Sequence, residues 1–181
     1  MLKIIVLILT LFIFLNAKET RVEIGQRAYI EVKELGLSYL ARIDSGARIT
    51  SLHALNIKLE GKASFLYVKK PLQKVKTRRI KIKNESYKLN IGKIISFDTI
   101  NELGKKVRIK ARVINVAQVR NAQGVEYRYI IRLGFRYKNI LKYNEVNLRD
   151  RSHMMYKLLI GRNWLNNDFI IKTDLNVKRR Y

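Results

Sequence analysis

The stretch Ile43-Asp44-Ser45-Gly46-Ala47 places an acid, a hydroxyl residue and a glycine directly after a strand-like run at residues 39–43. That order predicts a carboxylate on a tight turn at the end of a buried strand, because Gly46 allows a sharp backbone turn and Ser45 can bond nearby backbone. A carboxylate held this way can act as a general acid or base if a second one faces it. Asp44-Ser45-Gly46 is also an ordinary turn sequence, so this pattern alone does not exclude a plain turn without a catalytic role.

A second stretch lies far downstream: Leu158-Leu159-Ile160-Gly161-Arg162-Asn163-Trp164-Leu165. Together with Asp44-Ser45-Gly46-Ala47 it resembles the retropepsin-like aspartic proteases, and more closely the bacterial family labelled "ATP-dependent zinc protease", whose domain is retropepsin-like. The resemblance covers residues 22–175 in the same order, with further matching pieces at 41–48, 50–54, 150–154 and 169–171. Ser45 stands where that family usually has threonine, and it keeps the hydroxyl.

The resemblance implies an all-β, closed or partly open acid-protease barrel with a flap hairpin and one short C-terminal helix. It implies that Asp44 is catalytic, within an active-site turn completed by Ser45, Gly46 and Ala47. The implied flap tip consists of Arg120, Asn121, Ala122, Gln123 and Gly124, although a simple sheet hairpin explains the same pattern. Gly161, Arg162 and Asn163 would support the turn, with Arg162 bonding backbone carbonyls or an acid and Asn163 capping the following helix.

An aspartic protease needs two carboxylates that share a proton and activate a water molecule, and this chain has a single Asp-Ser-Gly. The simplest solution is a homodimer in which two Asp44 side chains meet at a two-fold axis. The alternative is a monomer, either inactive or using another acid. Asp150, Asp168 and Asp174 are the candidates for that acid, and each is also explained as a turn or surface residue.

His53 and His153 are the only histidines and are weak candidates for a zinc site. No His-Glu-x-x-His pair and no phosphate-binding Gly-x-x-x-x-Gly-Lys-Ser/Thr loop occur, so we expect neither a metal nor another cofactor. The absence of cysteine excludes disulfides and a thiol nucleophile.

The formal net charge of +24 would attract anionic partners, although a lysine-rich solvated surface explains it equally well. We therefore expect a peptide or protein substrate, possibly an acidic one. The alternative function is a non-catalytic binding module of the same fold that holds an anionic envelope component or a protein partner. Nucleic acid is disfavoured, because no recognised nucleic-acid motif is present and the N-terminus reads as an export signal.

Residues 1–17 read as a signal peptide, with a basic Lys3, an apolar run at 4–15 and a small residue at Ala17. This predicts a periplasmic or secreted protein, with an inner-membrane anchor formed by residues 4–15 as the alternative. The folded domain is expected at 22–175 and a basic tail at 176–181.

Alternation of apolar and polar residues predicts a chain of strands rather than helices. We expect a hairpin between residues 106–119 and 127–133, a less certain strand and loop at 135–148, and one helix at 162–167. The other expected strands are 28–32, 38–43, 50–54, 56–60, 64–68, 79–83, 87–91, 157–160 and 169–172.

Overall fold

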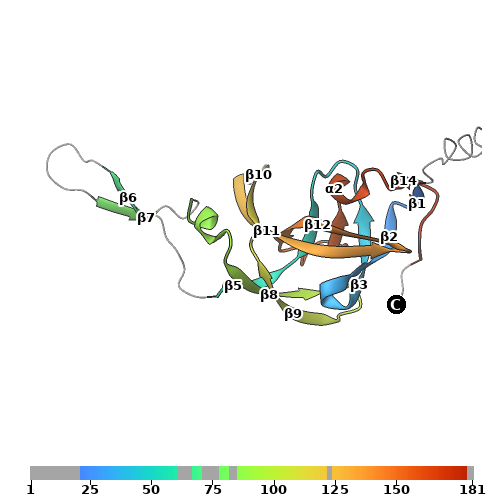
Figure 1. Ribbon diagram of the computed structural model, residues 1–181, viewed down its shortest axis with the longest axis horizontal. Helices are drawn as coiled ribbons and strands as arrows, with labels where there is room; N and C mark the ends of the chain where they lie inside the picture. The colour runs from blue at the N-terminus through green and yellow to red at the C-terminus, as the bar shows by residue number, and fades with distance from the viewer. Residues whose placement is uncertain (1–20, 61–66, 71–77, 82–84, 122–123, 179–181) are drawn as a thin grey trace, which may run out of the picture.

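The computed structural model describes residues 21–60, 67–70, 78–81, 85–121 and 124–178, and within these ranges it is mostly β-structure with one short α-helix. The main sheet has seven strands in the order β10-β11-β12-β4-β13-β3-β2. An additional pairing of β11 with β2 nearly closes the sheet into a ring (Figure 1). The bounds of these strands are β2 Arg27–Val32, β3 Leu37–Ile43, β4 Thr50–His53, β10 Asn115–Asn121, β11 Gly124–Tyr137, β12 Ile140–Arg149 and β13 Leu158–Ile160.

Three smaller sheets accompany the main one. A three-stranded sheet runs β5-β8-β9, and two pairs are formed by β1 with β14 and by β6 with β7. Figure 1 shows the β6–β7 pair to one side of the main body. Their bounds are β1 Val22–Ile24, β5 Leu55–Leu59, β6 Tyr67–Lys70, β7 Arg78–Lys81, β8 Ile94–Ile100, β9 Lys106–Arg112 and β14 Phe169–Ile171.

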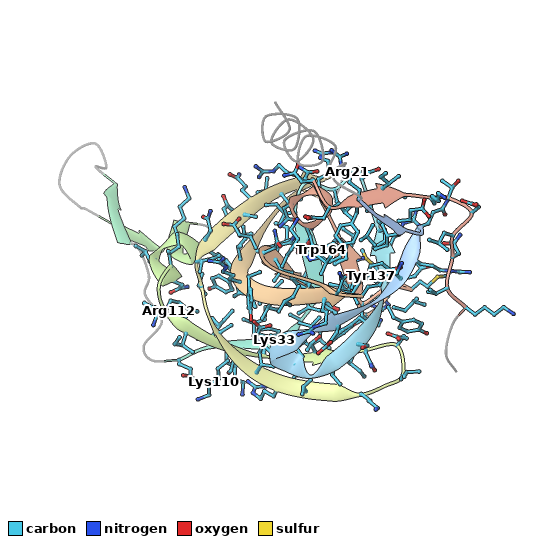
Figure 2. The ribbon with its side chains drawn as sticks, turned by 45° about the vertical axis from the view of Figure 1, so that its right-hand side comes forward. Arg21, Lys33, Lys110, Arg112, Tyr137 and Trp164 are labelled. Carbon is cyan, nitrogen blue, oxygen red and sulfur yellow. The ribbon has the colours of Figure 1, made fainter. Side chains whose placement is uncertain are left out.

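The hydrophobic core fills the ring of strands. Trp164, on the single helix α2 (Arg162–Leu165), is fully buried and stacks on Phe169 with ring centroids 4.3 Å apart. Figure 2 shows Trp164 inside the ring and Lys110 and Arg112 on the outer strands. Because Trp164 also donates its indole N–H to the Phe135 carbonyl at 3.3 Å, the helix is fixed against the sheet at a defined depth.

Strand β13 lies within the main sheet, between β4 and β3. It runs parallel to β3 and antiparallel to β4, and β4 in turn runs parallel to β12. The chain therefore inserts a late strand between two early ones. This arrangement brings the start of α2 to the point where β3 ends.

Most of the predicted strands are confirmed, with shifts of a few residues at their ends. The predicted strand at 87–91 is wrong: Glu85–Asn90 forms a short 3₁₀ helix, η2. Tyr87 stacks on Tyr127 of β11 at a centroid distance of 5.8 Å and lies tilted against Tyr129 at 5.2 Å, and Asn90 donates to the Tyr129 hydroxyl at 2.8 Å. These tertiary contacts stabilise the 3₁₀ helix more than the alternation of apolar and polar residues favours a strand.

The predicted long strand at 106–119 divides into two. Val113 donates its N–H to Lys93, and Ile114 donates to Ile130, so the chain changes partners between adjacent residues. The first half, β9, pairs with β8, a strand that was not predicted. The second half, β10, forms the expected hairpin with β11.

The predicted helix at 162–167 is confirmed but ends at Leu165. The expected signal peptide at 1–17 and the last three residues of the expected tail at 176–181 lie outside the described residues, as do parts of the strands expected at 64–68 and 79–83. In the part of the chain that the structure describes, no helix has the length and apolar character needed to cross a membrane.

Candidate active site

Asp44 lies immediately after β3, where three separate segments meet. Its backbone N–H donates to the Ile160 carbonyl at 3.0 Å, and the N–H of Ile43 donates to the Gln26 carbonyl at 2.9 Å. The end of β3 is therefore held between β2 on one side and β13 on the other. Since both neighbours belong to the main sheet, the backbone at Asp44 is fixed by the sheet rather than by its own loop.

The Asp44 carboxylate is oriented by its own turn. Oδ1 accepts the N–H of Gly46 at 2.9 Å and the N–H of Ala47 at 3.3 Å. Among the described residues none donates to Oδ2, and the side chain is only partly buried. One oxygen is thus anchored, while the other is available for a substrate, a water molecule or a second carboxylate.

The start of α2 braces the far side of this turn. Arg162 donates its backbone N–H to Ala47 at 2.8 Å and its guanidinium to the Ser45 carbonyl, also at 2.8 Å. Gly161 lies so close that a Cβ there would stand 2.7 Å from the carbonyl carbon of Ile49. Only glycine fits without displacing backbone, so the sequence Gly-Arg is a packing requirement of the turn.

Asn163 does not cap the helix, contrary to the sequence prediction. The helix N-cap is Gly161, and it makes no side-chain capping bond. The Asn163 side chain turns instead to the sheet, accepting from the N–H and hydroxyl of Thr50 and donating to the Glu145 carbonyl at 2.7 Å. It joins β4, β12 and α2 beneath the Asp44 turn.

The other acids considered as partners for Asp44 are engaged elsewhere. Asp168 accepts a 2.5 Å bond from Lys142, and Asp150 accepts the N–H of Ser152 at 2.8 Å within its own turn. Asp174 is exposed. Within the described ranges, no hydrogen bond or ion pair joins any of them to Asp44. A partner carboxylate from this chain is therefore not evident.

The two histidines occupy different environments. His53 is buried at the end of β4, and its Nδ1 accepts the N–H of Arg151 at 2.9 Å. His153 is exposed. Burial, and then the positive charge of Lys157, lower the pKa of His53. Because Nδ1 is already occupied, only Nε2 could bind a metal, and the described residues contain no group of three metal-ligating side chains.

A row of polar side chains on β4, β11 and β12 was not identified from the sequence. Ser51 donates to Asn147 Oδ1 at 3.0 Å, and Arg128 approaches the same oxygen at 3.4 Å. Glu126 forms ion pairs with Arg128 at 2.5 Å and with Arg149 at 3.5 Å. In sequence these residues are simply the polar half of alternating strands, so only their convergence in space marks them.

The predicted flap corresponds to the tip of the β10–β11 hairpin. Pairing continues to Asn121 opposite Gly124, and Ala122 and Gln123 lie outside the described residues. One face of the hairpin is supported by the packing of Tyr87 against Tyr127 and Tyr129. Its other face carries Glu126 and Arg128.

Two hollows are lined by residues described above or by their neighbours. One of about 550 Å³ is lined by His53, Glu102, Met155 and Lys157 among others. A second of about 380 Å³ borders Ser45 and Arg162 on the outer side of the Asp44 turn.

Comparison with known proteins gives consistent results. Residues 79–181 match the family profile described as RimB-like, retropepsin-like aspartic endopeptidase RimB. The matched segment contains β11, β12 and Gly161-Arg162-Asn163, whereas Asp44 precedes it. A crystal structure of a Legionella pneumophila protein of unknown function (DUF785) superposes with a TM-score of 0.59 at 18% identity, covering 86% of this chain and 96% of that one.

Two curated relatives come from Shewanella, and both are named "Probable alpha-L-glutamate ligase". The protein of S. halifaxensis is 28% identical over 153 residues, covering 82% of this chain and 28% of its own length. That of S. pealeana is 27% identical over 173 residues, covering 87% of this chain and 32% of its own length. The chain thus spans about a third of these relatives or less, so the match concerns one region of larger proteins.

Proposed function

The chain belongs to the RimB-like family of retropepsin-like aspartic endopeptidases, and from that premise we propose that it hydrolyses peptide bonds with Asp44 as its catalytic carboxylate. The observation that carries the proposal is the fixed geometry of the Asp44 turn. Oδ1 is held by Gly46 and Ala47, and the turn is locked against Gly161 and Arg162. A catalytic carboxylate requires this kind of rigid placement at the surface of a cleft.

The second carboxylate would come from a second copy of the chain. Two Asp44 turns related by a two-fold axis would share one proton, because two like charges at hydrogen-bonding distance cannot both ionise. The ionised Asp44 would deprotonate a water molecule that attacks the peptide carbonyl. The protonated one would donate to the carbonyl oxygen.

The β10–β11 hairpin would act as the flap. Residues 120–124 would close over the substrate, exclude water and bind its backbone in an extended form. The Tyr87 stack would hold the base of the hairpin while its tip moves.

An acidic peptide is the substrate class that the charge favours. The formal net charge of +24 would attract such a peptide. The names of the two Shewanella relatives, "Probable alpha-L-glutamate ligase", point the same way, since glutamate is an acidic residue. The proposed substrate is therefore a peptide or protein segment rich in carboxylates.

The export signal that we propose for residues 1–17 would place this activity in the periplasm or outside the cell, or at the inner membrane if residues 4–15 remain as an anchor. N-terminal sequencing of the protein recovered from a bacterial expression host tests this directly. A mature protein that begins at Lys18 supports cleavage, and an intact Met1 in a membrane fraction supports the anchor.

The decisive experiment compares the wild-type chain with Asp44→Asn on a peptide library that includes acidic sequences. Asparagine keeps the size and the Oδ1 acceptor but cannot hold the shared proton, so cleavage should fall by a factor of about 10³ or more. Asp174→Asn is the matched control, because Asp174 is exposed and makes no hydrogen bond or ion pair with the turn in the described structure. Cleavage that survives Asp44→Asn would reject the proposal. Salt-sensitive binding of an anionic partner that is indifferent to this change would favour the non-catalytic binding module instead.

A further inference from the structure

We propose that Arg128, Arg149 and Arg151 form a carboxylate-binding subsite of the substrate cleft, and that Glu126 of the same chain occupies this subsite until an acidic substrate displaces it. The inference rests on the proposed peptidase function and identifies the part of the cleft that would select acidic residues.

The first step is the position of Glu126. It lies on β11 near the tip of the hairpin, and its Oε2 pairs with Arg128 Nη2 at 2.5 Å and with Arg149 Nε at 3.5 Å. A single carboxylate oxygen thus lies between two guanidinium groups from adjacent strands. This is how proteins bind a carboxylate ligand, because the planar guanidinium presents paired N–H donors to it.

The second step is that the positive charge of these three arginines exceeds the negative charge of the carboxylate that pairs with them. Arg128 is 9% exposed and Arg151 7% exposed, yet Glu126 is the only acid within ion-pair distance of any of the three among the described residues. Three guanidiniums against the one ion-paired carboxylate leave a net charge of 3 − 1 = +2, which falls to 3 − 2 = +1 when the more distant Asp44 is also counted. Buried charge without a counter-charge is costly, so the site gains free energy by binding an anion.

The third step is the unsatisfied hydrogen-bonding capacity. The Nε of Arg128 is buried and has no hydrogen-bond partner in the described structure. Arg151 uses its Nε on the Tyr156 carbonyl at 3.0 Å, and no carboxylate in the described ranges pairs with its guanidinium. A buried donor without a partner is costly, so this Nε would gain free energy from contact with an acceptor such as a substrate carboxylate.

The fourth step places the subsite beside the catalytic turn. Burial, and then the charges of Arg149 and Arg128, lower the pKa of Arg151 to about 10, whereas the charge of Asp44 acts in the opposite direction. Arg151 therefore lies within electrostatic range of both the other two arginines and Asp44. Hydrogen bonds connect the subsite to the segment that follows the Asp44 turn, because Arg128 donates to Asn147 Oδ1 at 3.4 Å and Asn147 donates to the Thr50 carbonyl at 2.9 Å.

The fifth step is that Glu126 can be displaced. Its side chain is 37% exposed, and within the described structure its carboxylate bonds only to the two arginines. A glutamate or aspartate of a substrate would supply the same group and would release the hairpin side chain to water. Glu126 would thereby act as an internal competitor that makes binding selective for peptides with correctly placed carboxylates.

The test measures binding rather than cleavage, so that it is independent of catalysis. The full chain carrying Asp44→Asn is titrated by calorimetry with a hexaglutamate peptide, and with hexaglutamine as the uncharged probe, at 150 mM salt. Glu126→Gln removes the internal carboxylate while keeping its shape. Glu31→Gln is the matched control, because Glu31 also pairs with an arginine, Arg136 at 3.5 Å, and has a similar exposure.

We expect Glu126→Gln to bind hexaglutamate roughly 5- to 10-fold more tightly and Glu31→Gln to leave the affinity within about twofold. Arg149→Gln should weaken binding roughly 10-fold, with Arg149→Lys recovering only part of it because lysine lacks the planar fork. Equal effects of Glu126→Gln and Glu31→Gln, or no hexaglutamate binding by any variant, would overturn the inference. A wild-type chain that binds hexaglutamate as expected but cleaves nothing would refute the peptidase function and leave the subsite intact.

Discussion

Asn163 Oδ1 accepts two hydrogen bonds from Thr50, one from the backbone N–H and one from the hydroxyl, each 3.0 Å long. The same hydroxyl accepts the N–H of Gly161 at 3.2 Å. These bonds connect the first residue of β4 with the start of α2, which lie 113 residues apart in the chain. The Asp44 turn is built on this connection, and four predictions concern it and its surroundings.

Asn163→Ala should destabilise the fold by about 2–3 kcal/mol, because the buried Thr50 N–H and hydroxyl both lose their acceptor. Unfolding in urea, followed by the fluorescence of Trp164, the only tryptophan, measures this. Asn176→Ala removes an exposed amide that bonds only the Thr173 carbonyl and should change stability by less than about 0.5 kcal/mol. Equal losses in the two variants would contradict the role given to Asn163.

Gly161→Ala should cost about 3 kcal/mol, since the new Cβ would lie 2.7 Å from the Ile49 carbonyl carbon and backbone must move. Gly104→Ala is a useful comparison. It strains a positive φ of 77° but meets no neighbouring atom within 4 Å. The Gly161 change should also reduce peptidase activity, because the atoms it displaces belong to the Asp44 turn, whereas Gly104→Ala should affect stability alone. Activity that is unchanged in folded Gly161→Ala protein would argue against this coupling.

Arg162→Lys should lower kcat/KM by roughly 10-fold while changing the free energy of unfolding by less than about 1 kcal/mol. The lysine keeps the charge but cannot place a guanidinium N–H on the Ser45 carbonyl, which Arg162 reaches at 2.8 Å. The loss should therefore appear in kcat more than in KM. Arg136→Lys, on the distant end of β11, is the control for a general effect of replacing arginine. A loss confined to KM would indicate that Arg162 contacts substrate rather than the turn.

The stability of the fold should decrease as the pH falls below about 6.5, with His53 as one cause. Its pKa in the folded state is lowered, by burial first and then by Lys157 and Arg151, against the opposing charge of Asp150. The unfolded chain therefore binds a proton more readily than the folded chain. The stabilisation is complete above the unfolded pKa of 6.5 and is lost as the pH drops through and below that value.

Urea unfolding at pH 5, 6, 7 and 8 measures this effect. His53→Asn keeps an acceptor for the Arg151 N–H and removes the titrating group, so its stability should depend less on pH between 5 and 7. His153→Gln removes the exposed histidine and should retain the wild-type dependence. Identical profiles for all three proteins would show that His53 does not contribute.

The local features of this protein follow from short patterns in its sequence. Alternating apolar residues defined most strands, and the Asp44-Ser45-Gly46 order defined a tight turn at a strand end. These features follow from short-range rules on backbone freedom and side-chain alternation, which a few neighbouring residues are sufficient to express.

Which segments meet depends on long-range packing and strand pairing. The change of partner at Val113-Ile114 and the 3₁₀ helix at Glu85–Asn90 depend on distant strands, so local alternation misassigned both. The grouping of Glu126 with Arg128, Arg149 and Arg151 was invisible for the same reason. Glu126 and Arg128 lie on β11, Arg149 lies at the end of the adjacent β12 and Arg151 follows it, and long-range pairing of the strands sets their register.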